Sequence, residues 1–375
     1  PPEVLADRIR LRWSVEPMSA LYRNTACEWV FPAEVDPRRL PPGLIAVAML
    51  LCLHPHWTVL QPCRIRLPFS LAPEEQEFWR RLMRTQWETL EAYRQPDRAT
   101  TPFQVEWENP EPAHFHPVIP VPPGARCATA FSGGKDSLLQ AGVLSEITER
   151  PLLVAVTSPM PGLMDHQHPK RRRVLDEVEG RCSAQRVEIR SDFRACWENL
   201  HPFKLGYAVS VNEVTDTFFY LSMMLLTAHA LGASHLFLAS ENELQENQRD
   251  GDRLIQHPHA MYSGVALGVV RALLEPWGFT CSSLTFPLHS GQVQTLLWRR
   301  YPRLRDLQFS CWEVGAEAAM CNRCPQCLRI ALCAAAAGYD PEEMGADLAG
   351  LLIAQNRWAP KSFLPLREGA PPKMR

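Results

Sequence analysis

Two short stretches of the chain combine residue types that can do chemistry. The first is Ser-Gly-Gly-Lys-Asp-Ser at residues 132–137, between an apolar segment and a segment typical of a helix. Glycines let backbone N–H groups approach an anion closely, and the beginning of a helix adds N–H donors and a positive dipole end. Lys135 adds a point charge and the two serines add hydroxyls. The stretch therefore predicts a phosphate-binding loop, in which Asp136 ligates Mg²⁺ or caps the helix.

The second stretch holds four of the twelve cysteines, which are Cys311, Cys321, Cys324 and Cys327. Four thiolates, three of them at every third residue, suit a closed tetrahedral site for structural Zn²⁺. Three cysteines at this spacing also occur in iron–sulfur proteins, and buried free thiols are the remaining alternative. The other eight cysteines are scattered, and we interpret them as small buried apolar residues.

The composition narrows the class of protein. A length of 375 residues predicts two or three domains, and an apolar content of 46% is enough to build a proper core. These values exclude a disordered chain, a collagen-like chain and a small protein held together by disulfides. The net charge of −2 does not favour bulk electrostatic binding of nucleic acid or of an anionic membrane.

The apolar segments do not predict a membrane protein. The first residues are charged and lack the apolar region of a signal peptide, so we expect a cytoplasmic protein. The apolar run at 43–53 is too short to span a bilayer. The longer run at 218–239 contains polar and glycine positions, and we interpret it as a buried helix over 218–231 followed by a buried strand over 235–239.

A proline-rich segment divides the chain. Residues 109–124 hold six prolines, which disfavour both a helix and a central strand. The predicted parts are an N-terminal α+β accessory domain at 1–110, a linker at 111–124, the main domain at 125–345 with the cysteines at 311–327, and a C-terminal tail at 346–375. In the N-terminal domain, residues 58–68 predict a strand and Pro73–Tyr93 predicts a helix.

Strands and helices alternate in the main domain. Two-sided apolar strands of this kind are typical of a parallel sheet that is covered on both faces, so the fold class predicted is α/β. Besides the helix and strand at 218–239, the predicted strands are 126–131, 151–157 and 186–189, and the predicted helices are 138–148 and 171–182.

The glycine loop does not follow the Walker pattern. It resembles the SGGxDS signature of the PP-loop ATP pyrophosphatase superfamily, and it stands after the first strand of an α/β domain, where that superfamily has it. The resemblance implies cleavage of ATP between its α and β phosphates with Mg²⁺, adenylation of a substrate and release of pyrophosphate. It further implies that the catalytic residues are Lys135 and Asp136, and that ATP is bound by Ser132, Gly133, Gly134, Lys135, Asp136, Ser137, Val156 and Thr157.

The loop and the cysteines together are more specific than either alone. An SGGxDS loop with a C-terminal four-cysteine cluster resembles 7-cyano-7-deazaguanine synthase (QueC) and its relatives over residues 124–345. This resemblance implies a small carboxylate substrate, 7-carboxy-7-deazaguanine, with ammonia as acceptor in queuosine biosynthesis. Relatives in antiviral defence imply a protein amine as acceptor. A homodimer is compatible with either role.

Three further residues are candidates for substrate binding. Glu241 follows a buried strand, where open α/β sheets bind ligands, and it suits an amine or a ring N–H. Lys204 suits a carboxylate or phosphate, and Arg329 follows the cysteines and suits a phosphate. The stretch 239–264 differs from that of the synthase, so a different substrate or a different nucleophile is an alternative.

Other functions are also open. The same loop chemistry serves enzymes that modify tRNA and an epimerase that inverts the terminal glutamate of muramoyl peptides. The tRNA enzymes predict a basic face, which the composition does not favour. The alternative that is not an enzyme is a nucleotide-binding module that is held together by zinc.

Overall fold

The computed structural model describes most of the chain. The described residues are 1–16, 22–92, 102–108, 126–158, 168–196, 211–242, 248–250, 253–255, 264–309, 311, 320–322 and 324–352. The predicted linker at 111–124, Lys204 and most of the predicted tail at 346–375 lie outside these residues.

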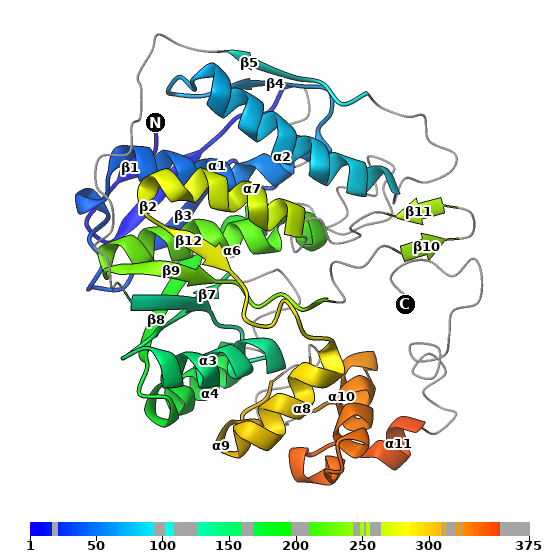
Figure 1. Cartoon of the computed structure of the whole chain (residues 1–375). Helices are drawn as coiled ribbons and strands as arrows, with labels where there is room; N and C mark the ends of the chain where they lie inside the picture. The colour runs from blue at the N-terminus through cyan, green and yellow to red at the C-terminus, as the bar shows by residue number, and fades with distance from the viewer. Residues whose placement is uncertain are drawn as a thin grey trace.

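A mostly parallel sheet forms the centre of the molecule (Figure 1). Its strand order is β1-β2-β3-β8-β7-β6-β9-β12, and β8, β7, β6, β9 and β12 run parallel to one another. The bounds of these strands are β1 Glu3–Val4, β2 Arg8–Arg12, β3 Ala26–Val30, β6 Arg126–Ala130, β7 Leu152–Thr157, β8 Gln185–Ser191, β9 Ala233–Phe237 and β12 Thr280–Ser282. The predicted α/β class is therefore confirmed.

The order of the parallel strands reverses beside β6. The chain first builds outward on one side, from β6 to β7 to β8, and then returns to the other side of β6 to add β9 and β12. In sheets of this kind, the loops at the carboxyl ends of the two strands that flank the reversal leave a crevice where ligands bind. The segments after β6 and β9 are therefore the place where the fold itself predicts a site.

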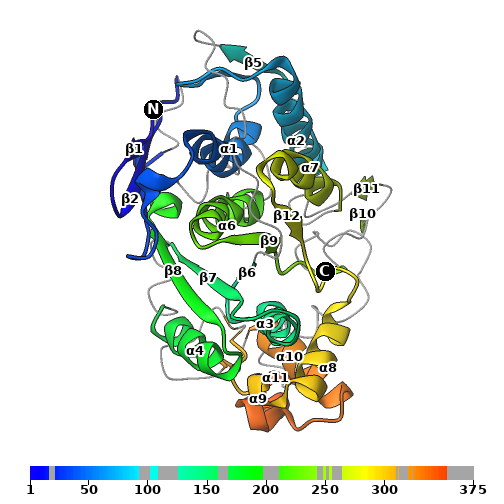
Figure 2. The ribbon, with the colours of Figure 1, turned by 60° about the vertical axis from the view of Figure 1, so that its left-hand side comes forward.

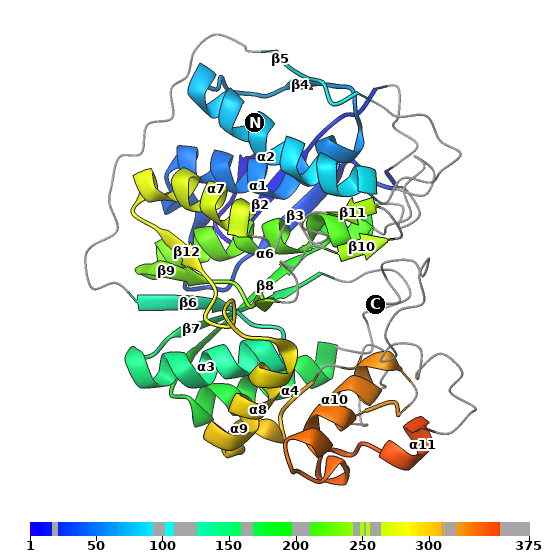
Figure 3. The same cartoon turned by 45° about the vertical axis from the view of Figure 1, so that its right-hand side comes forward.

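Helices cover both faces of the sheet, as Figures 1 and 2 show. One face carries α1 Pro42–Val59, α2 Pro73–Ala92, α6 Val211–Ala230 and α7 Gly264–Leu274. The other face carries α3 Lys135–Ile147, α4 His168–Arg181, α8 Ser290–Arg300 and α9 Pro302–Arg305. The last helices, α10 Pro325–Ala336 and α11 Leu348–Leu352, lie beyond α8 (Figure 3). Each face has its own hydrophobic core, because the buried strand residues alternate between the two sides.

The N-terminal residues extend this sheet and share its core. Strand β3 pairs antiparallel with β8 through Trp29 and Val30, and α1 packs against α6. A separate parallel pair, β4 Cys63–Arg66 and β5 Val105–Glu108, lies near α2, and a small hairpin is formed by β10 Gln248–Asp250 and β11 Arg253–Ile255. The accessory domain at 1–110 stays a prediction, but β1, β2, β3 and α1 belong to the same layers as the main domain.

Helix α1 corrects one sequence interpretation. The apolar run at 43–53 was expected to end too early to span a bilayer, yet the helix continues through Pro55 to Val59. Among the described residues it is the one helix long and apolar enough to cross a membrane, and 89% of it is buried inside the protein. Its contacts with α2 and α6 account for this burial, since it packs as the central helix of one core.

The boundaries predicted in the main domain are close to those observed. In the N-terminal region, only 63–66 of the strand predicted over 58–68 forms a strand, because Thr58 and Val59 belong to the end of α1. Helix α6 begins at Val211, seven residues before the predicted start, because its first two turns are polar and lack apolar periodicity. Four short 3₁₀ turns complete the described structure, at Pro37–Arg39, Phe193–Cys196, Glu275–Trp277 and Pro341–Met344.

The packing of α3 against the C-terminal helices can be tested with Gly142→Ala. An added Cβ at Gly142 would lie 2.8 Å from the buried ring of Tyr301, so the ring or the helix must shift. We expect the free energy of unfolding, measured by urea denaturation, to fall by about 1–3 kcal/mol.

Gly268→Ala on α7 is the matched control, because no atom lies within 4 Å of its added Cβ. This variant should gain about 0.5–1 kcal/mol from the better helix propensity of alanine. A Gly142→Ala protein as stable as this control would contradict the tight contact.

Candidate functional site

The predicted phosphate loop folds as a strand, a tight turn and a helix. Strand β6 ends at Ala130, and α3 begins at Lys135. Gly133 has a φ of +83°, a backbone conformation that side chains strongly disfavour, so the first glycine is required by the turn. The first N–H groups of α3 have no partner within the helix, which makes this end of α3 suited to an anion.

The two serines of the loop hold its backbone. The hydroxyl of Ser137 accepts from the N–H of Gly133 at 3.1 Å and donates to the carbonyl of Gly134 at 3.0 Å. The hydroxyl of Ser132 accepts from the N–H of Gly134 at 3.4 Å. The loop is thus closed on itself through side-chain hydroxyls, and the N–H groups of Gly133 and Gly134 could instead donate to a stronger acceptor such as phosphate.

A buried ammonium lies at the beginning of α3. Lys135 is 4% exposed, and its Nζ lies 2.8 Å from a carboxylate oxygen of Asp136 and 2.5 Å from one of Glu241. Glu241 is itself buried and comes from the segment that follows β9. A buried charge is tolerated when it is paired. Here one ammonium is shared by two carboxylates, and these lie in the segments that follow β6 and β9, the two strands that flank the reversal of strand order.

The shared cation affects the protonation of Asp136. Burial raises the pKa of Asp136 to about 6, while the charge of Lys135 acts in the opposite direction. This carboxyl group therefore binds its proton more tightly in the folded protein than in the unfolded chain.

The backbone next to Glu241 is anchored from the loop after β12. The carbonyl of Ser240 accepts from the hydroxyls of Ser283 at 2.8 Å and Thr285 at 2.9 Å, and its N–H donates to Ser283 at 3.0 Å. Asn242 on the other side donates its N–H to the carbonyl of Leu288 at 2.9 Å. These bonds fix the turn that carries Glu241 toward Lys135.

A cavity of about 120 Å³ opens beside Ser132. It lies between the carboxyl ends of β6, β7 and β9 and the first half of α6. Its apolar lining includes Val154, Val156 and Leu238, and its polar lining includes Arg171 and Thr217. A cavity at this place in the fold can hold part of a small ligand whose remainder reaches the loop.

The four cysteines predicted as metal ligands are brought together. Their sulfur atoms all lie within 4.8 Å of one another. The Sγ atoms of Cys311 and Cys324 are 3.7 Å apart, and those of Cys321 and Cys327 are 3.8 Å apart. Four sulfurs bound tetrahedrally to zinc at about 2.3 Å would be separated by about 3.8 Å. The cluster therefore has the donor atoms and the spacing to hold a metal such as zinc.

The local structure supports this arrangement. Cys324 precedes α10, and its sulfur accepts from the N–H of Cys327 at 3.4 Å. Asn322 has a φ of +54°, and its side chain bonds the backbone of Gly345 at 2.9 Å and Asp347 at 3.0 Å, which fastens the turn. A hydrogen bond with the thiol of Cys311 raises the pKa of Cys324 to about 12, and burial acts in the same direction.

The cysteine cluster is connected to the phosphate loop. The N–H of Phe309, two residues before Cys311, donates to the carbonyl of Gly133 at 2.8 Å. The preceding residue, Gln308, exchanges two buried amide hydrogen bonds with Gln294 of α8 and accepts from the indole of Trp298. The segment that leads into the cluster is thereby held rigidly against the glycine turn.

The remaining predicted residues are placed as follows. Val156 lines the cavity and Thr157 ends β7, so both lie at the carboxyl edge near the loop. Arg329 lies on α10, half-buried, and its Nε has no hydrogen-bond partner among the described residues. No contact joins it to the loop in the described part of the chain.

Sequence analysis missed Thr217 and Tyr220, which line the cavity together with Arg171 of the basic run at 170–173. Thr217 and Tyr220 lie on α6 and belong to no motif, so no sequence signal marks them. Comparison of the chain with protein-family models and with curated proteins gives no match. The resemblance to the PP-loop superfamily thus depends on the loop and cysteine residues themselves.

Metal analysis tests the cysteine cluster. We expect the purified protein to contain one zinc ion per chain by mass spectrometry, and Cys324→Ser and Cys327→Ser to lose it with a clear fall in the unfolding midpoint.

Cys333→Ser, on the same helix but outside the cluster, should keep its zinc. Iron and sulfide in place of zinc would identify an iron–sulfur cluster, and a metal-free stable protein would identify free thiols.

The pH dependence of stability tests the environment of Asp136. Because its pKa is raised to about 6 from the usual 3.8, its favourable contribution is complete below pH 4 and is lost as the pH rises through 6. Relative to Asp136→Asn, the wild-type protein should lose on the order of 1–2 kcal/mol of unfolding free energy between pH 4 and pH 7. Urea denaturation across this range measures the difference, and parallel pH profiles would refute the raised pKa.

Proposed function

We propose that the chain is an enzyme of the PP-loop type that activates a carboxylate with ATP, forming an acyl-adenylate and releasing pyrophosphate. One observation carries this proposal. The SGGxDS sequence forms a strand, turn and helix at the reversal of strand order, with a buried ammonium at the beginning of the helix. Glycine N–H groups, a helix terminus and a cation at one point favour a polyphosphate.

The residues of the loop have distinct roles in this proposal. The N–H groups of Gly133 and Gly134 exchange their serine partners for phosphate oxygens. Lys135 turns from Glu241 toward the β and γ phosphates, and Val156 and Thr157 border the nucleotide at the end of β7. Asp136 offers the carboxylate oxygen that Mg²⁺ prefers, and it would hold the ion that neutralises charge on the phosphates.

The proposed reaction requires that the enzyme position ATP and the acid, and it requires no nucleophile from the protein. An oxygen of the substrate carboxylate attacks the α phosphorus, the bond from that phosphorus to the bridging oxygen breaks, and pyrophosphate leaves. An amine then attacks the acyl carbon, AMP leaves, and the amine loses a proton. Loop N–H groups and Lys135 stabilise the charge that develops on the phosphates, and the enzyme holds the acid in line with the α phosphorus.

The proposed acid is 7-carboxy-7-deazaguanine. The cysteine cluster supports this choice, because its connection to Gly133 through Phe309 joins the two features on which the resemblance to the deazaguanine synthases depends. The proposed acceptor is ammonia or a protein amine. The proposed role of zinc is structural, since four cysteines leave no position for a substrate.

The proposal is tested by incubating the protein with ATP, Mg²⁺ and 7-carboxy-7-deazaguanine and measuring AMP and pyrophosphate. Both products should form in equal amounts and only when the acid is present. Asp136→Asn and Lys135→Ala should lower the rate by about 100-fold or more, because each removes a charge that acts on the phosphates.

Asp306→Asn is the matched control and should retain full activity, because this exposed aspartate follows α9 and pairs with Arg181 outside the loop. AMP formation with a glutamate-terminated muramoyl peptide instead of the deazaguanine would favour the epimerase, and with unmodified tRNA a tRNA-modifying enzyme. ATP binding without turnover of any acid would favour the non-catalytic module.

A further inference from the structure

Glu241 is paired in the free protein but loses its partner in the proposed reaction. Its carboxylate is buried, and one of its oxygens lies 2.5 Å from the Nζ of Lys135. When Lys135 turns toward the phosphates and Asp136 holds Mg²⁺, Glu241 is left as a buried carboxylate without a positive partner. An uncompensated buried charge strongly destabilises the folded state, so this carboxylate must then gain another cation or a proton.

The cation that fits this position is a primary ammonium. The Nζ of Lys135 is itself an alkylammonium, and it lies within hydrogen-bonding distance of both Glu241 and Asp136. An ammonium carries three N–H donors, which need oxygen acceptors when the group is buried. The acceptor in the proposed reaction is ammonia or a protein amine, and amines of this kind are protonated near neutral pH. The position of Nζ thus has the charge and the oxygens that such an acceptor requires.

The backbone that carries Glu241 is fixed by bonds that do not involve Lys135. The carbonyl of the preceding residue, Ser240, accepts from the hydroxyls of Ser283 and Thr285, and its N–H donates to Ser283. All three of these residues are buried. Because the turn is held from the loop after β12, Glu241 stays in place when the lysine ammonium moves away.

A buried glutamine on α3 anchors that loop. The Oε1 of Gln140 accepts from the N–H of Leu284 at 2.8 Å, and its Nε2 donates to the hydroxyl of Thr129 on β6 at 2.9 Å. Gln140 is fully buried, and Leu284 lies between the two hydroxyl residues that hold the turn. Gln140 and Lys135 belong to the same helix, so the anchor fixes Glu241 relative to the phosphate loop itself.

We propose that Glu241 binds the ammonium group of the acyl acceptor after Lys135 has left it, and that Gln140 is the positioning residue that keeps Glu241 in place for this exchange. The order of events, with ATP before the acceptor, rests on the proposed function. The binding of a primary ammonium by Glu241 does not, since it follows from the burial and charge of the carboxylate. The movement of Lys135 links binding of the nucleotide to binding of the acceptor.

Removal of the lysine ammonium tests the site without ATP. The side-chain atoms that Lys135→Ala removes are those of propylammonium, so this ion is the probe. Propylammonium chloride should raise the unfolding midpoint of Lys135→Ala by about 2–4 °C relative to sodium chloride at the same concentration, because a ligand that binds only the folded state stabilises it. The wild-type midpoint should not show this rise. Equal midpoints of Lys135→Ala in the two salts would overturn the ammonium site.

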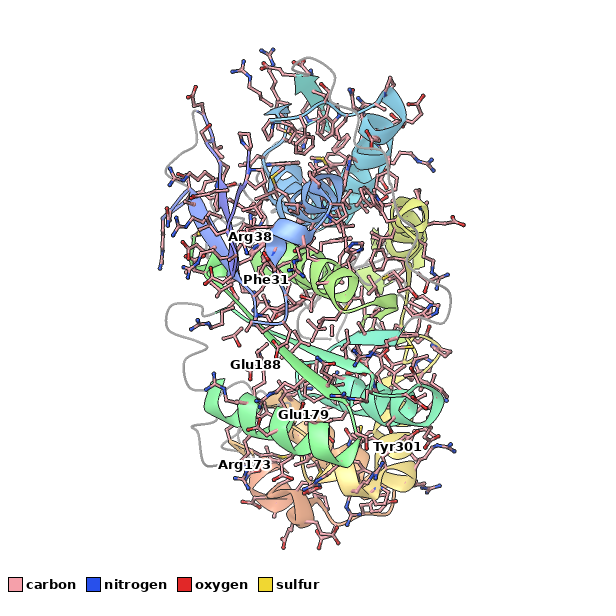
Figure 4. The ribbon with its side chains drawn as sticks, turned by 90° about the vertical axis from the view of Figure 1, so that its left-hand side faces the viewer. Phe31, Arg38, Arg173, Glu179, Glu188 and Tyr301 are labelled. Carbon is pink, nitrogen blue, oxygen red and sulfur yellow. The ribbon has the colours of Figure 1, made fainter. Side chains whose placement is uncertain are left out.

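A second substitution in the Lys135→Ala protein assigns the rise to one carboxylate. Adding Glu241→Gln should abolish the rise, whereas adding Glu179→Gln should not. Glu179 is the matched control, because it also lies beside a cation, Arg186, but at the amino end of β8, on the opposite edge of the sheet from the loop (Glu179 is labelled in Figure 4). A rise that survives Glu241→Gln would assign propylammonium to Asp136 or to the surface and overturn the proposal.

The two halves of the reaction separate the acceptor from the nucleotide. Glu241→Gln should retain acid-dependent exchange of labelled pyrophosphate into ATP within about 3-fold, because Lys135 and the loop remain. The concentration of ammonium or propylammonium that gives half-maximal release of AMP should rise by about 10–100-fold, since a charge-assisted hydrogen bond is lost. Loss of the exchange reaction would place Glu241 in adenylation and overturn the proposal.

Gln140→Met tests the anchor. This variant should raise the half-maximal acceptor concentration by about 3–10-fold and retain the exchange reaction, because the turn that carries Glu241 is loosened. Gln86→Met is the matched control, since Gln86 is also a buried helical glutamine bonded to a threonine hydroxyl, that of Thr58, on the opposite face of the sheet. Both variants should lower the unfolding midpoint. An acceptor concentration that is unchanged in Gln140→Met would limit Gln140 to the fold and overturn its positioning role.

Failure of the proposed function has a different result from failure of this inference. If no acid supports exchange, but propylammonium stabilises Lys135→Ala through Glu241, the ammonium site is retained and the ATP chemistry is refuted. If exchange proceeds and Glu241→Gln leaves the half-maximal acceptor concentration unchanged, the ATP chemistry is retained and the role of Glu241 is refuted.

Discussion

The site depends on the pairing of one buried ammonium with two carboxylates. Lys135 can be buried because Asp136 on its own helix and Glu241 after β9 both face it. Without both carboxylates, the charge of Lys135 would be buried uncompensated in a medium that solvates it poorly. When both are ionised they exceed the charge of one ammonium, which agrees with the raised pKa of Asp136. The same ion pairs join the loops of β6 and β9, so the electrostatic requirement of one side chain fixes the relative position of the two strand ends where the fold predicts a ligand.

The second organising contact runs from the glycine turn to the cysteine cluster. The bond between Gly133 and Phe309 joins the phosphate loop to a residue two positions before Cys311, and the buried amides of Gln294 and Gln308 fasten the neighbouring residue to α8. A metal bound by the four cysteines would hold together residues that are otherwise linked by a long connection. The stability of the cluster and the shape of the loop are therefore coupled through backbone and amide hydrogen bonds.

Local patterns predicted the α/β class, most of the element boundaries in the main domain and the convergence of the four cysteines. They failed where tertiary contacts decide. No local pattern contains the contact between Glu241 and Lys135, which spans 106 residues of sequence; binding of substrate by Glu241 stays a prediction. Thr217 and Tyr220 line the cavity from α6, and no sequence pattern indicates that position. Helix α1 was judged by apolar run length, whereas its extent follows from packing on α6.

The edges of the central sheet bear on how copies of this chain can associate. One edge is β1, two residues long with an exposed glutamate, and the other is β12, with three residues. Short edges of this kind offer few free backbone groups for a further strand, which is how natural sheets avoid uncontrolled joining to their neighbours. Joining two copies edge to edge through the central sheet would therefore add few backbone hydrogen bonds, and neither edge strand lies at the crevice between the ends of β6 and β9.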